Sequence, residues 1–530
     1  MATDGAGAFF TRLLSGSVAA RALSAISAGV GRYAQFSGIY SFFKRPERMT
    51  ALFYGSKIGQ IAAAVPEAFT RTLKHAGGFL NRKLEKTLTL WFITWLAERF
   101  DIVFLLFAAA HALVPYALYH NPYTVAALAV IFVFMCARVA FMKGQSAIFS
   151  IKRVDPVFIL YFFTIAASSV YSMFGAGRGQ GSLTTSSLYL AAISFTFIVA
   201  NAFHDHRRLL ILIRVLVSVS VIVALYGIYQ FFQGIPIDVT QTDQTTGGAS
   251  LAMGRADSTL GNPNVLAAWL LLMIPLSASF IFTAKNWLRK LFTAGISLTL
   301  IVCLLLTQSR SAWVGLFVAG AVFVFLIDWR LIPLFAAAGA LSIPFWPGFI
   351  MDRLSIAGTD TSSVYRFKIY AGAFRMAVAN WATGIGIGLE YFKRYINNYV
   401  YFAYETAPVH SHNLPLQIWL ESGILAVISF LWAMLRLIKK GGAYIFLHKR
   451  RYGAVLNSSA PAVNFIPRRG GQAYEARLIL TACISAVAGF ITQGCFEYVW
   501  FFPRCMNHFF MIIGIFYCAV NLTSQNQEIQ

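Results

Sequence analysis

The segment VHSHNLPLQIWLESG, residues 409–423, places ionisable groups at the start of an apolar run. If a helix begins just after Asn413, then Asn413, Gln417 and Glu421 are spaced by four residues and share one face. His412 would lie at the end of that helix, where a pKa near neutrality suits removal of a proton from a hydroxyl. A capping cluster with a buried, hydrogen-bonded Glu421 explains the same residues equally well.

Two arginines stand in unusual surroundings elsewhere. Arg255, in GRADSTLGNPN, precedes Asn262 and Pro263, which suit the cap and first turn of a helix. That role does not explain Arg255, for which a solvated loop position is the alternative to a site. Arg310, in LLLTQSRSAW, stands between two apolar runs. It must either snorkel to water or face a wet cavity that holds an anion.

These residue types together suggest one chemistry. Arginines present fork-shaped donors that match phosphate oxygens. A histidine beside them can deprotonate an acceptor hydroxyl. The substrate implied is an anionic, phosphate-bearing amphiphile delivered from a membrane, and the reaction implied is group transfer to an alcohol.

The elements that must position these groups are membrane helices. Hydrophobic residues make up 58% of the 530-residue chain and charged residues 12%, and apolar stretches of roughly 17–25 residues recur, the length of a transmembrane helix. We predict an all-α polytopic membrane protein with about twelve transmembrane helices in one bundle. The predicted spans are 101–119, 121–141, 157–175, 183–202, 209–232, 263–284, 291–309, 312–327, 331–350, 414–437, 476–496 and 506–522.

Charge predicts the orientation of these spans. Alternate connections are rich in Lys and Arg, as at residues 143–153, 207–208, 285–290 and 439–469, whereas the connections between them carry few. The basic connections and both termini are therefore expected to be cytoplasmic. The net charge of +23 then reflects contact with anionic headgroups and requires no nucleic-acid partner.

The chain divides into three predicted parts. Residues 1–87 are a basic tail, read as amphipathic helices on the inner membrane face or, alternatively, as a partly disordered leader. Residues 88–522 form the transmembrane domain, with a cytoplasmic loop at 438–475, and residues 523–530 form a C-terminal tail.

A large outer loop, residues 351–413, lies between the ninth and tenth spans. Its SVYRFKIYAGAFRMAVANW has helical apolar spacing and predicts an amphipathic helix at the outer surface. GIGIG, residues 384–388, follows as a flexible turn, because it lacks the strand–turn–helix setting of a nucleotide site.

Cysteines and acidic residues give weaker signals. Cys495 and Cys505 flank an outward loop, EYVWFFPR, and whether they pair is left open. The outward carboxylates show no tight pairing typical of a cation site; they are Asp238, Asp243, Asp257, Asp352, Asp360 and Glu405.

Several stretches together carry a family resemblance. RADSTLGNPN, LLLTQSRSAW, the run from YRFKIYAGAFRMAV to GIGIGLEYF, and HNLPLQIWLESGILAVISFLW resemble successive landmarks of the bacterial O-antigen ligase and polymerase superfamily, in the family's order over roughly residues 200–440. The last matches the pattern of His, then Asn, Ser or Gln, then nine residues and Gly, at His412, Asn413 and Gly423. Ala426 departs from the Gly, Thr or Tyr that the pattern favours three positions later.

The resemblance implies a GT-C-type glycosyltransferase in the bacterial inner membrane, with its site facing the periplasm. Such an enzyme takes a glycan from an undecaprenyl-pyrophosphate carrier without a metal or cofactor. By motif position, His412 corresponds to the general base, Arg255 and Arg310 to pyrophosphate-binding arginines, and Arg366 to a weaker fourth candidate. Asn413, Gln417 and Glu421 would support His412.

The expected reaction is an inverting displacement at the carbon that carries the pyrophosphate. The acceptor could be a glycan, a lipid or a protein, so polymerase and ligase activities both stay open. A transporter of an anionic solute or lipid-linked sugar is the alternative from another class, although no internal repeat is visible and the candidate groups cluster on the outer rim.

Overall fold

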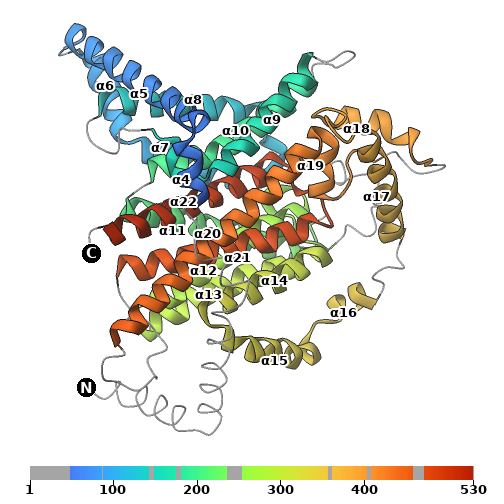
Figure 1. The fold of residues 1–530 in the computed structure, drawn as a ribbon. Helices are drawn as coiled ribbons and strands as arrows, with labels where there is room; N and C mark the ends of the chain where they lie inside the picture. The colour runs from blue at the N-terminus through green and yellow to red at the C-terminus, as the bar shows by residue number, and fades with distance from the viewer. Residues whose placement is uncertain are drawn as a thin grey trace, which may run out of the picture.

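The computed structural model describes residues 48–85, 87–142, 149–174, 181–203, 205–235, 254–355, 361–402, 408–456 and 471–528. Over these ranges the chain is helical and has no strand, which confirms the all-α class. The helices are, in chain order, α4 (Arg48–Gly55), α5 (Lys57–Lys83), α6 (Leu88–Glu98), α7 (Phe100–Leu113), α8 (Asn121–Phe141), α9 (Pro156–Phe174), α10 (Gly181–Ala202), α11 (His206–Gln233), α12 (Pro263–Thr283), α13 (Trp287–Leu306), α14 (Arg310–Asp328), α15 (Ile332–Ser342), α16 (Gly348–Ser355), α17 (Thr361–Ala379), α18 (Leu389–Tyr395), α19 (Leu414–Ser422), α20 (Ile424–Leu456), α21 (Gln472–Gly494) and α22 (Pro503–Glu528) (Figure 1).

Nine segments in the described part of the chain are long and apolar enough to cross a membrane. They confirm a polytopic membrane protein. In Figure 1, α12, α13, α14, α20 and α21 run side by side along one diagonal of the view. The helices α12, α21 and α22 are the most deeply buried of the nine segments, so they form the centre of the bundle.

Two predicted spans are shorter than expected. The first, 101–119, ends at Leu113 because Pro115 disfavours helical geometry at the residue before it. The ninth, 331–350, contains the short helix α15, which turns back along α14 so that the Phe335 ring lies 5.5 Å from that of Phe317.

The tenth predicted span, 414–437, is broken. Gly423, with φ of 81°, separates the short α19 from the long α20. The helix α20 then continues to Leu456, so the first half of the predicted loop 438–475 is helical. The predicted C-terminal tail is helical as far as Glu528, where α22 ends. Lys and Arg are good helix formers, and helices extend readily beyond the apolar stretch that the sequence marks.

The predicted basic tail is described from Arg48 onward, and residues 1–47 lie outside the described ranges. Its helices α4 and α5 contact the connection before α9: the Tyr54 hydroxyl donates to the Ile151 carbonyl at 3.0 Å, and Lys152 pairs with Glu67 at 3.1 Å. Farther along the chain, Cys495 and Cys505 are both free thiols.

The bundle packs backbone to backbone where α14 crosses α21. A Cβ added at Gly315 would lie 2.7 Å from the Gly489 carbonyl oxygen, and one added at Gly489 would lie 2.8 Å from the Gly315 carbonyl oxygen. Small residues drive such close contacts in membranes, where lipid tails remove the hydrophobic incentive to associate. The contact holds the start of α14, which carries Arg310, near the end of α21.

The α17–α18 lobe, residues 361–402, confirms the predicted amphipathic helix and turn. It has its own small core, in which Ile369, Met376 and Phe392 are buried. The GIGIG turn docks on the break between α19 and α20: the Ile385 N–H donates to the Leu420 carbonyl at 2.7 Å, and a Cβ at Gly384 would lie 2.4 Å from that oxygen. Glycine is needed there for close backbone approach.

We predict that Gly315→Ala destabilises the protein by about 1–3 kcal/mol, because the added methyl group overpacks the crossing of α14 and α21. The matched control is Gly295→Ala on α13, where a Cβ meets nothing within 4 Å and helix propensity favours alanine. Thermal unfolding of the two purified variants would measure the difference. Equal stability of the two variants would contradict this account of the contact.

Candidate active site

His412 lies in the loop that leads from the α17–α18 lobe into α19. Asn413 caps α19, since its Oδ1 accepts from the Leu416 N–H at 2.9 Å, and Pro415 occupies the first turn. The Asn413 side chain also donates to the Cys495 carbonyl at 2.7 Å. These contacts place His412 at the mouth of the helix, as predicted, but with its side chain buried.

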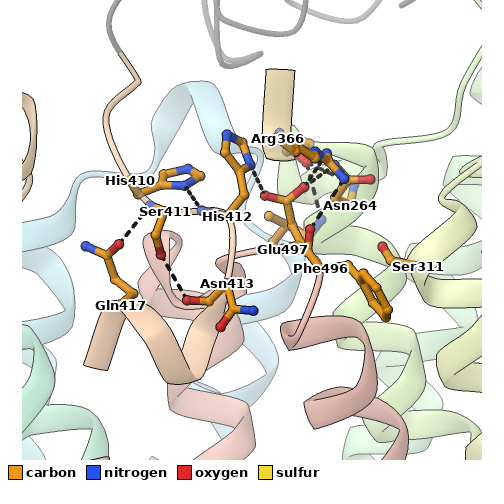
Figure 2. A network of polar contacts seen from close by, with 12 residues as sticks. Asn264, Ser311, Arg366, His410, Ser411, His412, Asn413, Gln417, Phe496 and Glu497 are labelled. Atoms are coloured by element: carbon orange, nitrogen blue, oxygen red, sulfur yellow. Dashed lines mark hydrogen bonds and ion pairs between the residues drawn. The ribbon is translucent and has the colours of Figure 1, made fainter. Parts of the chain in front are cut away.

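Glu497 is the partner of His412, and the sequence interpretation had not included it. His412 Nδ1 lies 2.8 Å from Glu497 Oε1, while Arg366 Nη2 and Asn264 Nδ2 lie 2.8 Å and 3.0 Å from Oε2 (Figure 2). Glu497 sits in the short connection between α21 and α22. The sequence signal that could have revealed Glu497 was an acidic residue in EYVWFFPR, a mostly apolar loop predicted to face outward.

Arg255 joins the same network through Asn264. Its Nη2 donates to Asn264 Oδ1 at 3.2 Å, and its Nε donates to the Thr307 carbonyl at 2.8 Å. The backbone beside it is tied to the end of α13, since the Ala256 N–H donates to the Leu306 carbonyl at 3.1 Å. Arg255 is therefore held inside the cluster, and the solvated-loop alternative does not describe its surroundings.

Arg310 approaches from the start of α14 and contacts α17. Its Nη2 donates to Ser363 Oγ at 3.3 Å, one helical turn before Arg366. A further arginine, Arg353 on α16, was not predicted; its charge acts on Arg255 together with those of Arg366 and Arg310. The structure thus brings all three predicted arginines to one place and adds a fourth.

The residues predicted to support His412 form a layer beneath it. The Ser411 N–H donates to Gln417 Oε1 at 2.8 Å (Figure 2). Gln417 Nε2 in turn donates to Glu421 Oε1 at 3.0 Å. The Tyr189 hydroxyl donates to Glu421 Oε2 at 2.7 Å. Gln417 and Glu421 therefore hold the backbone next to His412 and do not touch its ring in any of these contacts.

Backbone strain is concentrated around this cluster. In the described ranges, the non-glycine residues with positive φ are Ser258, Gln308 and His412, at 52°, 53° and 51°. Ser258 lies three residues after Arg255, Gln308 lies two residues before Arg310, and the third is the histidine itself. Such conformations cost about 1–3 kcal/mol each and persist where the surroundings enforce them, which is common at functional sites.

The electrostatics favour an anion. Burial, and then the charges of Arg353 and Arg366, lower the pKa of Arg255 to about 9. Burial alone would raise the pKa of Glu497, but Arg366 and His412 hold it well below its ordinary value. The carboxylate therefore stays ionised and can only accept, so His412 Nδ1 must donate and Nε2 is the basic nitrogen.

A cation is the other ligand to consider. His410, His412 and Glu497 offer ligand atoms that all lie within 4.8 Å of one another. However, His410 Nδ1 accepts the His412 N–H at 3.2 Å, and Arg366 occupies the same carboxylate that a metal would need. A metal ion would also share this space with several guanidinium groups, so the charge balance disfavours it.

The six carboxylates considered from sequence do not form this group. Asp238, Asp243, Asp360 and Glu405 lie outside the described residues. Asp257 is described and buried, and burial raises its pKa to about 6. Asp352 is exposed on α16.

We predict that Glu497→Gln costs about 3 kcal/mol, because Arg366 and His412 lose their buried counter-charge. The native pKa is depressed, so this stabilisation is full above the unfolded value of about 4.3 and declines as the pH falls below it. The difference in unfolding temperature between wild type and variant should thus shrink in acid. A difference that stayed constant down to strongly acidic pH would contradict the ion-pair account.

One comparison with known proteins gives a match to part of the chain. Residues 295–431 match the family model described as O-antigen ligase, a segment that includes Arg310, Arg366 and His412. No curated protein matches the chain. The match supports a membrane-embedded, glycosyltransferase-type role in polysaccharide biosynthesis. Over these residues the chain is similar to the O-antigen ligase family, which supports membership of the O-antigen ligase and polymerase superfamily.

Proposed function

We propose that the protein transfers a glycan from an undecaprenyl-pyrophosphate carrier to a hydroxyl of a glycan, lipid or protein acceptor. The observation that carries the proposal is the pairing of His412 with an ionised Glu497 beside Arg255, Arg310 and Arg366. In this proposal, a base, its orienting carboxylate and an anion-binding cluster lie together at one end of the membrane bundle. Polymerase and ligase activities share that chemistry.

The arginines would hold the pyrophosphate. Pyrophosphate is the leaving group, and its negative charge grows as the bond to the sugar breaks. Arg310 and Arg366 lie on two elements, α14 and α17, that meet through Ser363, so one bound anion could engage both forks. Arg255 adds charge in a partly buried place where its own pKa is already lowered.

His412 would act as the general base. Glu497 fixes the ring with Nδ1 protonated, so Nε2 takes the proton of the acceptor hydroxyl. The acceptor oxygen then bonds to the sugar carbon from the face opposite the pyrophosphate. The carbon–oxygen bond to pyrophosphate breaks with its electron pair, which inverts the configuration at that carbon. No metal enters this scheme, because the arginines supply the positive charge.

The orientation follows from charge. Three basic connections lie at the ends of spans opposite the cluster of arginines and His412: Lys152 to Arg153, Arg207 to Arg208, and Lys285 to Lys290. By the positive-inside rule they would face the cytoplasm, with both termini. The site would then open to the periplasm of a bacterial inner membrane, where lipid-linked glycans are presented.

A transporter is the competing function. Transporters usually bind their substrate near the membrane midplane between broken helices. Here the predicted arginines and His412 lie in connections and helix ends at one end of the bundle, which favours surface chemistry. Uptake of a solute into liposomes by purified protein, without any glycan product, would favour the transporter.

The decisive experiment incubates purified protein with a lipid-pyrophosphate glycan and a panel of acceptors, with a chelator present, and analyses the products by mass. We expect transfer to at least one acceptor. His412→Ala should lower transfer by about 10²- to 10⁴-fold and leave donor binding intact. The control His120→Ala, at an exposed position, should leave both transfer and donor binding at their wild-type levels. Undiminished transfer by the His412 variant would remove it from the role of base.

We further predict that Arg310→Lys lowers turnover by about tenfold or more, because lysine keeps the charge but loses the two-pronged donor geometry. Arg375→Lys, at an exposed position on α17, is the matched control. Steady-state transfer rates at saturating donor would measure both. Wild-type turnover in the Arg310 variant would indicate that Arg310 does not bind the pyrophosphate and only snorkels to water.

A further inference from the structure

The helix α17 carries an apolar stripe that stays largely exposed in the described part of the protein. Val364, Phe367, Phe374, Val378 and Trp381 are all exposed, with the two phenylalanines 66% and 55% accessible and Trp381 60%. The four stripe residues within α17 are spaced by three, seven and four positions and share one helical face, and Trp381 follows two residues after the helix ends at Ala379. From Val364 to Val378 the stripe extends for about 21 Å at the usual helical rise.

Two other sides of α17 pack against the rest of the protein, so the helix is held in place while the stripe stays exposed. Tyr365, Ile369 and Met376 are buried in the core of the lobe. Arg366 and Tyr370 turn toward the bundle, where the Tyr370 hydroxyl donates to the His412 carbonyl at 3.2 Å. At 100° per residue the stripe lies roughly a quarter turn from this bundle-facing side. It therefore runs beside the bundle, away from the lobe.

One end of the stripe adjoins the arginines. Val364 and Phe367 flank Arg366 in the chain, and Ser363 contacts Arg310 at 3.3 Å. At the other end Trp419 closes the stripe: its Nε1 donates to the Trp381 carbonyl at 3.1 Å, and its ring meets that of Phe374 edge-on. In Figure 1, α17 stands across the ends of the bundle helices, next to α18.

We propose that this stripe receives the isoprenoid chain of the carrier lipid. The inference rests on the proposed function, in which Arg310 and Arg366 hold the pyrophosphate. The isoprenoid chain is bonded directly to the pyrophosphate. It therefore needs an apolar surface that begins at the arginines that hold the pyrophosphate. The stripe begins there and continues along one helix to a tryptophan pair, a residue type that favours the membrane interface.

The continuity of the stripe with the arginine cluster favours the isoprenoid chain over other molecules that could cover the stripe. Bulk membrane lipid would also cover exposed phenylalanines, but it would do so irrespective of the carrier's length. A second copy of the chain would cover the stripe only in an oligomer. The test must therefore depend on the length of the isoprenoid chain.

The test compares the full-length carrier with a truncated carrier of a few isoprene units, each bearing the same glycan. In Phe374→Ser/Val378→Ser, which alters only the part of the stripe farthest from Arg366, the KM for the full-length donor should rise about tenfold because apolar contact is lost. The KM for the truncated donor, which does not reach these residues, should stay at its wild-type value.

Phe292→Ser/Leu298→Ser is the matched control. These α13 side chains are 71% and 60% exposed, so the control removes comparable apolar surface elsewhere in the bundle, and its KM values should be unchanged. Equal effects of the α17 variant on both donors would overturn the proposal in favour of a structural or bilayer-contact role. No effect on either donor would overturn it as well. If the wild type is an oligomer and the variant is a monomer, a second copy of the chain covers the stripe, and the proposal is also overturned.

A second measurement separates this proposal from the proposed function. A polyprenyl pyrophosphate without glycan, carrying a photoreactive group in its chain, should label peptides that contain residues 361–381. Labelling of α17 in a protein that transfers no glycan would support the stripe and reject the transferase. Glycan transfer with labelling confined to other helices would support the transferase and reject the stripe.

Discussion

The candidate site depends on a buried carboxylate. Glu497 is removed from water, and an ionised carboxylate in such a place is tolerated only when cations and hydrogen-bond donors surround it. Arg366, His412 and Asn264 provide that surrounding from three separate parts of the chain. The carboxylate in turn lets several arginines stand close together, because it offsets part of their mutual repulsion. Removing Glu497 would leave the arginines around it without this counter-charge.

Membrane packing brings these parts together. The contact of Gly315 with Gly489 sets the spacing of α14 and α21, and so of Arg310 and the loop that carries Glu497. The cap of Asn413 on α19 and its bond to the Cys495 carbonyl tie the histidine loop to the end of α21. The α17–α18 lobe then lies over this framework and contributes Arg366. Helix crossings, and not a separate soluble domain, therefore determine the geometry of the described site.

Much of this arrangement can be predicted from the sequence, and the missing parts have physical reasons. Apolar length identifies membrane helices, and four-residue spacing places Gln417 and Glu421 on one face below His412. The order of the family-like sequence stretches predicts that Arg255, Arg310 and His412 belong to one site. Which side chains touch depends on helix crossings, and pattern reasoning does not determine these.

Glu497 and Arg353 show what pattern reasoning misses. Glu497 lies in an apolar loop outside every landmark, so nothing local marks it as the partner of His412. Arg353 lies on α16, just beyond the predicted span 331–350 and outside every landmark. The breaks at Pro115 and Gly423 were also missed, because hydropathy averaged over a window does not register a single residue that ends a helix.

The position of Glu497 along the chain has a consequence for biosynthesis. It lies 85 residues after His412, 131 after Arg366 and 233 after Asn264. A ribosome inserting this protein therefore releases the cationic members of the cluster first, and they must wait for their counter-charge until α21 has entered the membrane. Contacts so distant in sequence form late in folding. The incomplete chain thus carries arginines and a histidine without the carboxylate that pairs with them, and the assembled candidate site arises only when the last two helices close the bundle.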